Sequence, residues 1–380
     1  MMNWPRVHLG DVAKIERDGV APSVIPNGTL YVGLEHIEPG GRLLDVRQVF
    51  NGELASTKFR FSPRHLLYGK LRPYLAKIAM PGFEGVCSTD ILPVLPGPNL
   101  DRSFLAHILR QPEMVALAAS RSEGANLPRL SPKTLADFKI PLPSLDEQKR
   151  IAAILDQADH LRWLRQRALD RLNDLGRAIF FEMFYAAEQF DECPLRDLCE
   201  VITDGTHYTP TYVDEGIMFL SAKNVTSGYV DWASVKYIPP RLHKELQKRV
   251  APQVNDILLA KNGTTGIAAI VDKDFTFDIY VSLALLRPSK EVLPTYLHHA
   301  LNSQQCVSQF HAALKGIGVP NLHLKDIRQA RIPKPPLALQ DEFVQRIVKV
   351  EKVREQHRVS LESMNALFAA LQHRAFNGEL

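Results

Sequence analysis

Two short segments gather cationic and hydrogen-bonding side chains closely enough to do chemistry. One is Asp204-Gly-Thr-His-Tyr-Thr-Pro210, which is dense in short polar side chains. The other is Tyr68-Gly-Lys-Leu-Arg-Pro-Tyr-Leu-Ala-Lys77, which sets three cations among two tyrosines on a turn stiffened by glycine and proline. Asp204 and His207 are close enough for acid–base work, but no nucleophile or metal-ligand set accompanies them. We therefore interpret both segments as contact surfaces or turns rather than catalytic centres.

A search for catalytic motifs supports this interpretation. The sequence contains no G-x-x-x-x-G-K-[ST] phosphate-binding loop and no G-x-G-x-x-G after a strand. Tyr237-Ile-Pro-Pro240 lacks the acidic or amide residue that begins an amino-methyltransferase motif, and Asp146-Glu147-Gln148-Lys149 is explained by the start of a helix. His298 and His299 lie in a helical pattern without a ligand partner at metal spacing. We expect a chain that catalyses nothing itself.

The contact segments have the composition of a nucleic-acid surface. Lysine and arginine neutralise phosphates or pair with guanine in the major groove, and small amides and hydroxyls reach other base edges. The candidate residues of the first half are Lys70, Arg72, Tyr74, Lys77, Arg121, Asn126 and Arg129. Those of the second half are Thr206, His207, Tyr208, Thr209, Lys223, Asn224, Lys261, Asn262, Thr264, Thr265 and Lys315. The alternative for each is a solvated surface turn.

An internal repeat explains why such segments occur twice. Residues 126–143 and 318–335 share the pattern that pairs Pro128 with Pro320 and Leu130 with Leu322, always 192 residues apart. Lys70 matches Lys261 at an offset of 191, and the segment starting at Leu9 matches that starting at Leu195 at 186. Such a repeat predicts two copies of one structural unit whose front parts differ in loop length.

Each copy is predicted to consist of an α+β domain, here called the front, followed by one long helix. The fronts mix short β-rich runs with glycine and proline turns, and a single helix is expected over 104–120 and over 295–314. Apolar residues then recur near heptad spacing at Ile151, Ile154, Ala158, Leu161, Ala168, Leu172, Leu175 and Ile179, and at Phe343, Ile347, Val350, Leu361, Met364, Phe368 and Leu371. The predicted segments are domains 1–144 and 189–336 and helices 145–188 and 337–380.

Ser144-Leu-Asp-Glu147 predicts a capping box at the start of the first long helix. Helices of this length would form rods of about 60 and 50 Å. The row of apolar residues along one such helix must be buried against another surface, and we expect the other long helix to provide it. The alternative is that each helix lies flat on its own domain. Since a turn of B-DNA covers about 34–36 Å, paired rods could hold two DNA contacts more than one turn apart.

Composition narrows the class of protein without deciding its partner. The chain has 380 residues, 45% of them hydrophobic, and a net charge of +4 spread without a polybasic block. It has no window of 18 apolar residues and no apolar leader, so we expect no membrane span and a cytoplasmic protein. Its four cysteines show no C-x-x-C spacing, which favours reduced thiols.

Motifs in a fixed order make the chain resemble the specificity subunit of Type I restriction–modification systems. The motifs are Asp204-Gly-Thr-His-Tyr-Thr-Pro210, Ile217-Met-Phe-Leu-Ser-Ala-Lys-Asn-Val225, Gly318-Val-Pro-Asn-Leu322 and Pro141-Leu-Pro-Ser-Leu-Asp-Glu-Gln-Lys-Arg-Ile151. The resemblance implies two tandem target recognition domains joined by long helices that pair as an antiparallel coiled coil. It also implies double-stranded DNA, two methyltransferase subunits and motor–nuclease subunits as partners. S-adenosylmethionine, ATP and Mg²⁺ would belong to those subunits, with no cofactor on this chain.

The two halves depart from each other within this pattern. The first half has Gly124-Ala-Asn-Leu-Pro-Arg-Leu130 at the repeated turn and no equivalent of the Asp204-Gly-Thr-His segment. The second long helix has Leu339-Gln340 where the first has Glu147-Gln148. Unlike domains predict an asymmetric DNA target. The remaining alternatives are a duplicated-domain scaffold that binds proteins rather than DNA, and an enzyme fragment.

Overall fold

The computed structural model describes residues 4–186, 190–314 and 320–380 of the chain. It contains two compact units, one formed by residues 1–166 with 359–380 and the other by residues 167–358. Each unit therefore contains one globular front together with part of both long helices. The division by residue range made from the sequence stays a prediction.

The front of the first unit is built on three antiparallel or mixed sheets. β1 (Arg6–His8) pairs with β11 (Lys139–Pro141), and a four-stranded sheet has the order β2-β10-β7-β8. A five-stranded sheet has the order β3-β6-β9-β4-β5, with β4 and β9 parallel. The strands are β2 (Ala13–Ile15), β3 (Gly19–Val20), β4 (Thr29–Val32), β5 (Arg47–Val49), β6 (Lys58–Phe61), β7 (Leu66–Gly69), β8 (Ile78–Ala79), β9 (Gly85–Cys87) and β10 (Ile91–Pro96).

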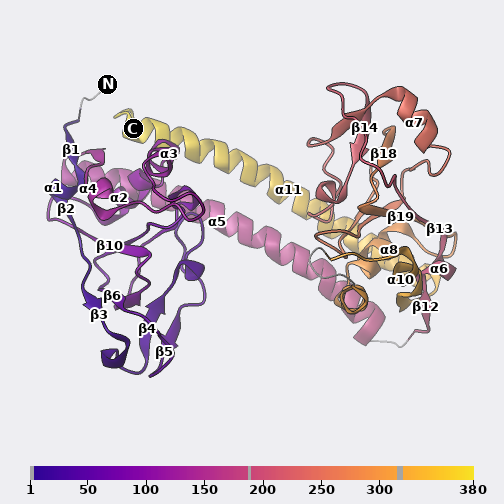
Figure 1. Ribbon diagram of the computed structural model, residues 1–380, viewed down its shortest axis with the longest axis horizontal. Coiled ribbons are helices and arrows are strands. Elements are labelled where there is room, and N and C mark those ends of the chain that lie inside the picture. The colour runs from indigo at the N-terminus through magenta and orange to yellow at the C-terminus, as the bar shows by residue number, and fades with distance from the viewer. Residues whose placement is uncertain (1–3, 187–189, 315–319) are drawn as a thin grey trace. The chain divides into compact units, whose positions relative to one another are not determined.

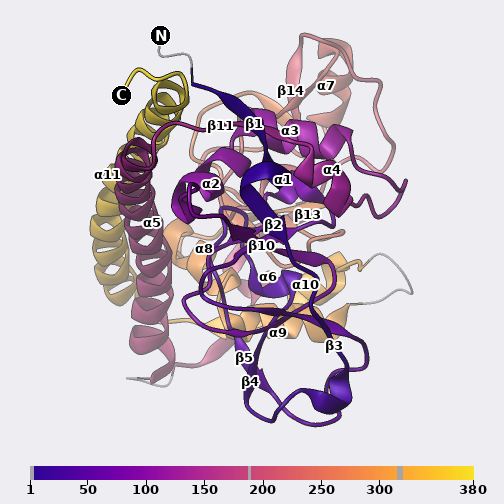
Figure 2. The ribbon, with the colours of Figure 1, turned by 90° about the vertical axis from the view of Figure 1, so that its left-hand side faces the viewer.

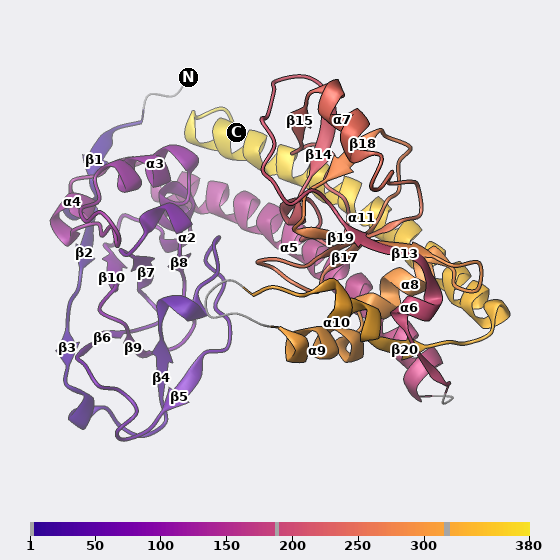
Figure 3. The ribbon, with the colours of Figure 1, turned by 45° about the vertical axis from the view of Figure 1, so that its right-hand side comes forward.

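Short helices complete this front. They are α1 (Leu9–Val12), η1 (Pro22–Val24), η2 (Leu34–His36), η3 (Pro73–Leu75), α2 (Arg102–Leu109), α3 (Pro112–Ser120) and α4 (Pro132–Ala136). The strands β3, β4 and β5 lie at the end of the domain away from α2 and α3 (Figures 1 and 3). Two separate apolar clusters, one around Phe104 and one around Phe61, match these two ends.

The second unit repeats the arrangement with different additions. β12 (Glu192–Pro194) pairs with β20 (Arg331–Pro333), a second sheet has the order β13-β19-β16-β17, and a third has β15-β14-β18. The strands are β13 (Cys199–Asp204), β14 (Ile217–Leu220), β15 (Lys236–Ile238), β16 (Ile257–Ala260), β17 (Ala268–Ile270), β18 (Phe277–Ile279) and β19 (Leu283–Pro288). Its helices are α6 (Leu195–Leu198), η5 (Ala222–Asn224), α7 (Pro240–Leu246), α8 (Pro294–Leu301), α9 (Gln304–Ala313) and α10 (Leu324–Gln329).

Matching hydrogen bonds confirm the repeat. The amide of Leu9 donates to the carbonyl of Phe138 at 2.8 Å, and that of Leu195 donates to Ala330 at 2.9 Å. The parallel pair β4–β9 corresponds to β14–β18. The two fronts differ in this sheet. In the first unit β3 and β6 extend it to five strands, whereas in the second unit the sheet β15-β14-β18 has three strands and α7 packs beside β18.

The expectation of a single helix before each repeated turn was wrong. Residues 104–120 divide between α2 and α3, because Pro112 opens a new helix at its first turn. Residues 295–314 divide between α8 and α9, where the Ser303 side chain caps the new helix by accepting from the amide of Cys306 at 3.3 Å. Proline and N-cap signals inside an apolar run were the sequence features that announced both breaks.

The two long helices are α5 (Leu145–Phe181), continued by a π-helical turn at Glu182–Ala186, and α11 (Leu337–Phe376). At the start of α5 the Ser144 hydroxyl accepts from the amide of Glu147 at 3.3 Å. The Glu147 carboxylate does not complete the predicted capping box. It accepts from the Arg150 guanidinium at 2.8 and 2.9 Å.

Within each unit the helices pack together in antiparallel fashion, as the fold prediction required. In the first unit the early part of α5 lies beside the late part of α11 (Figures 1 and 2), where Arg162 donates to Asn365 at 2.8 Å. In the second unit the late part of α5 meets the early part of α11, where Phe180 and Phe343 have ring centres 5.4 Å apart. The α+β fold with paired long helices is confirmed.

The apolar seam of α5 differs in part from the heptad prediction. Leu161 and Leu175 are 47% and 45% exposed, whereas Leu155 and Phe180 are buried. Arg162 lies in the helix contact, with its guanidinium 4.3 Å from the ring centre of Phe368. The contact between the two helices therefore contains an arginine stacked on a ring as well as apolar residues, and a hydrophobic pattern does not reveal such a cation.

Each front also packs against the end of the long helix that belongs to the other copy of the repeat. Phe104 lies 5.5 Å from Phe376 of α11, and Tyr296 lies 4.9 Å from Phe184. Both pairs are related by the same offset of 192 residues. The repeat is thus completed in each unit by a helix end taken from the other half of the sequence.

Candidate nucleic-acid interface

The cationic turn of the first unit is a shaped loop between β7 and β8. Arg72 and Ala76 adopt left-handed backbone conformations with φ of 50° and 47°, on either side of η3. This conformation leaves the side chains of Arg72 and Tyr74 exposed, while Lys70 is partly buried. Lys77 turns inward, and its ammonium donates to the carbonyl of Leu34 at 2.7 Å. The loop thus presents one guanidinium and one aromatic ring to solvent.

The repeated turn is fastened to this loop. The amide of Leu130 donates to the carbonyl of Lys70 at 2.9 Å, and the amide of Arg72 donates to Pro128 at 2.8 Å. These bonds bring Asn126 and Arg129, both exposed, next to a loop that lies more than 50 residues earlier in the chain. The exposed loop residues Arg72 and Tyr74 therefore share one surface with Asn126 and Arg129, whereas Lys77 points inward.

The cations of this surface have local partners that orient them. Arg129 donates to both Asp90 oxygens, at 3.0 and 3.4 Å, and this hydrogen bonding raises the pKa of Arg129. The Arg121 guanidinium lies 5.8 Å from the ring centre of Phe138. Because guanidinium groups keep unused donors in such contacts, both can still meet a phosphate.

The second unit fastens the equivalent loop in the same way. The amide of Leu322 donates to the carbonyl of Lys261 at 2.8 Å, and the amide of Gly263 donates to Pro320 at 3.2 Å. Asn262 and Asn321 form the isolated bridge that Leu71 and Arg129 form in the first unit. Thr264 is exposed and Thr265 partly so. Lys315 lies outside the described residues.

Lys261 has a different role from the one expected at a contact surface. Its side chain is only 7% exposed, and its ammonium donates to Asp204 at 2.7 Å. Arg249 donates to the other Asp204 oxygen at 2.5 Å. A buried lysine paired with a buried carboxylate holds the two loops that carry them together. The structure favours positioning over direct contact for Lys261.

The Asp204 loop itself divides into buried and exposed residues. Thr206 is buried, and its amide donates to the carbonyl of Ile279 at 3.1 Å. His207, Tyr208 and Thr209 are exposed, and the Thr209 hydroxyl lies 3.3 Å from the Tyr280 hydroxyl. The carboxylate of Asp204 therefore anchors a loop whose next turn faces solvent with three hydrogen-bonding side chains.

Lys223 and Asn224 separate in the same manner. Lys223 is exposed, whereas Asn224 is buried and its side-chain oxygen accepts from the amide of Ser221 at 2.9 Å. The Asn224 amide group also donates to Ser234 at 3.0 Å. With its hydrogen bonds used internally, Asn224 shapes the turn that presents Lys223.

Sequence reasoning missed the residues that hold these loops. Asp90, Arg249 and Tyr280 were not among the candidates, although each contacts one of them. Asp204 was noticed only for its nearness to His207, which is 3.5 Å away. The spacing of acidic residues around the lysine turns could have suggested Asp90 and Asp204, but that signal is common on protein surfaces.

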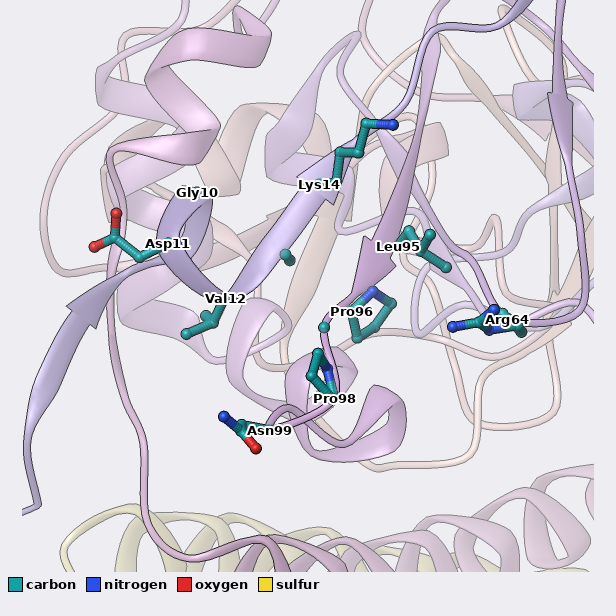
Figure 4. Close-up of a pocket in the computed structure, with 11 residues that line it drawn as sticks. Gly10, Asp11, Val12, Lys14, Arg64, Leu95, Pro96, Pro98 and Asn99 are labelled. Carbon is teal, nitrogen blue, oxygen red and sulfur yellow. The ribbon is translucent and has the colours of Figure 1, made fainter.

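One open cavity of the first unit's front does not belong to this surface. It has a volume of about 660 Å³ and lies between the segment from Gly10 to Lys14 and the segment from Leu95 to Asn99. The charged ends of Asp11, Lys14 and Arg64 point apart rather than toward a shared centre (Figure 4). A pocket without converging polar groups has no feature of a catalytic or ligand site.

Other site classes find no support in the part of the chain that the structure describes. No group of three or more histidine, cysteine or acidic side chains is placed to hold a metal ion there. Among those same residues, no helix is both long and apolar enough to cross a bilayer.

Comparison with known proteins adds the family context. The model of the Type I restriction modification DNA specificity domain matches residues 1–173 and again 187–362. The specificity subunit of the EcoBI enzyme of Escherichia coli is 25% identical, over all of this chain and 86% of its own length. The EcoDI specificity subunit of Escherichia coli is 28% identical over 48% of this chain, and the match spans 41% of that relative.

A solved structure shares the fold over nearly the full chain. It was described for complex assembly and conformational transition of a type I R-M system, and it covers 99% of this chain and 98% of its own. Its TM-score is 0.55 at 20% identity. The similarity extends to the doubled architecture found above.

Proposed function

The chain belongs to the Type I restriction modification DNA specificity family, and from this premise we propose that it selects an asymmetric, two-part sequence in double-stranded DNA. Each recognition domain would contact one half of the target in the major groove. Phosphate contacts would fix the register of each domain, and base contacts would choose the sequence.

One observation carries this proposal. The same pair of backbone hydrogen bonds fastens the repeated turn to the lysine loop in both units, but the side chains on that frame differ. The first unit presents Arg72, Tyr74 and Arg129, and the second presents Thr264 and the His207–Thr209 segment. The same hydrogen-bonded pair of loops therefore carries different exposed side chains in the two units, which fits a target whose two halves differ.

The contact residues follow from exposure on this frame. In the first unit we propose Lys70, Arg72, Tyr74, Arg121, Asn126 and Arg129 as DNA contacts. In the second we propose His207, Tyr208, Thr209, Lys223, Asn262, Thr264 and Thr265. Lys77, Thr206, Asn224 and Lys261 would act by holding these loops, since each side chain or backbone is bonded inside its own domain.

Catalysis would rest with partner subunits. The relatives are named as specificity subunits of restriction enzymes, and the similar structure concerns assembly of a type I system. We propose that this chain docks two methyltransferase subunits, which bind S-adenosylmethionine, and joins motor–nuclease subunits that use ATP and Mg²⁺. In this proposal the chain binds no cofactor itself and acts in the cytoplasm.

Methylome sequencing of cells that express the chain with its methyltransferase partner tests the proposal. We expect methylation at one asymmetric sequence of two defined halves separated by an undefined spacer. Exchanging the two exposed loop sets between units should change both halves. Partner-dependent methylation without a bipartite sequence, or protein binding without any DNA binding, would favour the scaffold alternative.

A further inference from the structure

Each recognition domain sends one loop to a long helix, and the two loops are equivalent in the repeat. In the first unit the loop lies between η2 and β5, where Gly41 donates to Glu38 at 2.8 Å and Leu44 donates to His36 at 2.9 Å. In the second unit the loop lies between η5 and β15. There Gly228 donates to Val225 at 2.9 Å and Asp231 donates to Asn224 at 2.8 Å. This matched bonding makes Tyr229 the equivalent of Arg42.

The tips of both loops make a cation–π contact with a helix. The Arg42 guanidinium carbon lies 4.2 Å from the ring centre of Trp163 on α5. The Arg354 guanidinium carbon on α11 lies 4.2 Å from the ring centre of Tyr229. Trp163 and Arg354 lie one residue apart in the register of the repeat, because the offset of 192 pairs Trp163 with Glu355, the neighbour of Arg354. The contact is therefore repeated at the same distance, but the loop supplies the cation in one unit and the ring in the other.

A carboxylate accompanies the cation in both units. Glu351 accepts from Arg354 at 2.6 Å, and Asp159, its equivalent at an offset of 192, acts electrostatically on Arg42. Burial lowers the pKa of Arg42 and of Arg354, while the nearby Asp159 and Glu355 oppose this. A guanidinium keeps its charge despite such a shift. The helix thus offers a ring beside an acid in one unit and a cation beside an acid in the other.

The backbone presents both tip residues from a fixed loop. Gly41 and Gly228, which precede Arg42 and Tyr229, have φ of 88° and 80°. A β-carbon on Gly41 would lie 1.7 Å from the carbonyl oxygen of Ile78, so this loop is pressed onto its own domain. In the second unit, the His298 ring nitrogen Nε2 donates to the carbonyls of Ala268 at 3.0 Å and Gly228 at 3.2 Å.

Little else fills the space beside the second contact. A cavity of about 710 Å³ lies there, lined among others by Tyr229, Gly176 and Glu351. A domain that leaves a cavity against its helices can tilt unless a contact at the rim resists the motion. Tyr229, the ring of the second contact, lines this cavity.

We propose that the contacts Arg42–Trp163 and Tyr229–Arg354, here called helix straps, fix the angle of each recognition domain on its long helix. They thereby set how strictly the chain selects the spacing between the two half-sites. This inference rests on the proposed function. A domain that tilts more freely would bring its contact loops to half-sites at more than one spacing. The straps are positioning residues, since neither pair belongs to the DNA-contact surface.

The test uses the full chain assembled with its methyltransferase subunits. Methylation rates are measured on DNA carrying the natural spacer and spacers one base pair longer or shorter. Trp163→Arg sets two guanidiniums against each other and should lower the ratio of natural to altered spacer rates by about 2- to 30-fold, the factor expected for one cation–π contact. Adding Arg42→Tyr places a tyrosine in the loop and an arginine on the helix, as in the second unit, and should restore the ratio. The half-site sequences should not change.

Two further variants keep the result decisive. Lys273→Ala removes a cation–π contact between neighbours in one loop, where the ammonium lies 5.6 Å from the Phe275 ring, and should leave the ratio unchanged. Tyr229→Ala truncates a side chain that is 46% exposed and tests the second strap if Trp163→Arg does not fold. An unaltered ratio in folded Trp163→Arg or Tyr229→Ala protein overturns the inference, as does a loss that the double variant fails to restore. Failure of the proposed function would show earlier, as absence of bipartite methylation by the unsubstituted chain.

Discussion

Gln148 and Gln340 make the same three hydrogen bonds at the starts of the two long helices. The side-chain oxygen of Gln148 accepts from the amide of Asp101 at 2.8 Å, and its nitrogen donates to Asn99 at 3.0 Å and Pro143 at 2.9 Å. Gln340 does the same with Leu293, Glu291 and Pro335 at 2.8, 3.1 and 2.9 Å. Both side chains are fully buried. Each glutamine therefore joins its helix to the front of its own unit.

Removing this side chain should destabilise the unit that contains it. Gln148→Ala leaves one amide and two carbonyls without partners, so we expect a loss of about 1–3 kcal/mol in the free energy of unfolding. Gln148→Glu should lose more at neutral pH, because an ionised carboxylate cannot donate to either carbonyl. Urea denaturation measures both. Gln345→Ala is the matched control, since the exposed Gln345 donates only to Asp341 within its own helix. Equal stabilities of Gln148→Ala and Gln345→Ala would contradict the assigned role.

The buried pair of Asp204 and Lys261 predicts a non-additive response. Asp204→Asn leaves the Lys261 ammonium buried without a countercharge and should cost about 3–5 kcal/mol of stability. The double variant Asp204→Leu with Lys261→Met removes both charges and should cost clearly less. Chemical denaturation of the three proteins checks this. A double variant as unstable as Asp204→Asn would show that the pair does not act as a unit.

The stability of the second unit should decrease in acid through His299. This ring packs against Phe343 at 5.1 Å, and burial, with His298 adding repulsion, lowers the pKa of His299 to about 3. In the unfolded chain the pKa is about 6.5, so between these values only the unfolded state binds the proton. Stability from this group is thus complete above about pH 6.5 and is lost toward pH 3, by about 1.4 kcal/mol per pH unit.

His299→Asn should flatten that dependence. The variant lowers stability at pH 7. Because asparagine cannot bind a proton, unfolding no longer takes up a proton at this position, and the free energy of unfolding should fall less steeply between pH 6.5 and 4. Urea unfolding at several pH values measures the slope. His298 stays in the variant and keeps its own lowered pKa, so a residual slope remains. An unchanged slope would mean that His299 titrates normally in the folded protein.

Loss of one exposed cation should affect only one half of the target. Arg72→Ala should weaken binding of the assembled complex to DNA. If Arg72 contacts one phosphate, the slope of log K against the logarithm of salt concentration should become smaller in magnitude by about 0.9. Specificity at the second half-site should be unchanged. Arg60→Ala is the matched control, because Arg60 lies in the same unit and pairs with Asp18 at 3.7 Å. Equal binding by both variants would remove Arg72 from the interface.

The long helices should determine the spacer length. Deleting about one heptad from both α5 and α11 keeps their facing residues in phase and should change the number of base pairs between the half-sites. The half-sites themselves should persist, since no recognition loop is altered. Methylome sequencing of the variant decides this. Altered half-sites with an unchanged spacer would exclude the helices as the ruler.

Local signals in the sequence were sufficient for much of this fold. The offset of 192 residues announced the duplication, prolines such as Pro141 and Pro333 marked the joint before each helix, and Ser144 marked a helix start. These are short-range patterns that act within a few residues of the structure they specify. The same reasoning overlooked the breaks at Pro112 and Ser303 because apolar residues continue across both.

The sequence by itself determined that the chain is two related α+β units with a long helix after each front, because repeat, periodicity and capping are written locally. Only the tertiary structure decided which candidate residues face solvent, why Lys261 is paired inside, and how Gln340 repeats Gln148. It alone showed Arg42 against Trp163 and Tyr229 against Arg354. Such contacts join residues more than 100 positions apart, and an exchange of cation and ring between copies leaves no matching letters for a comparison of the two halves to find.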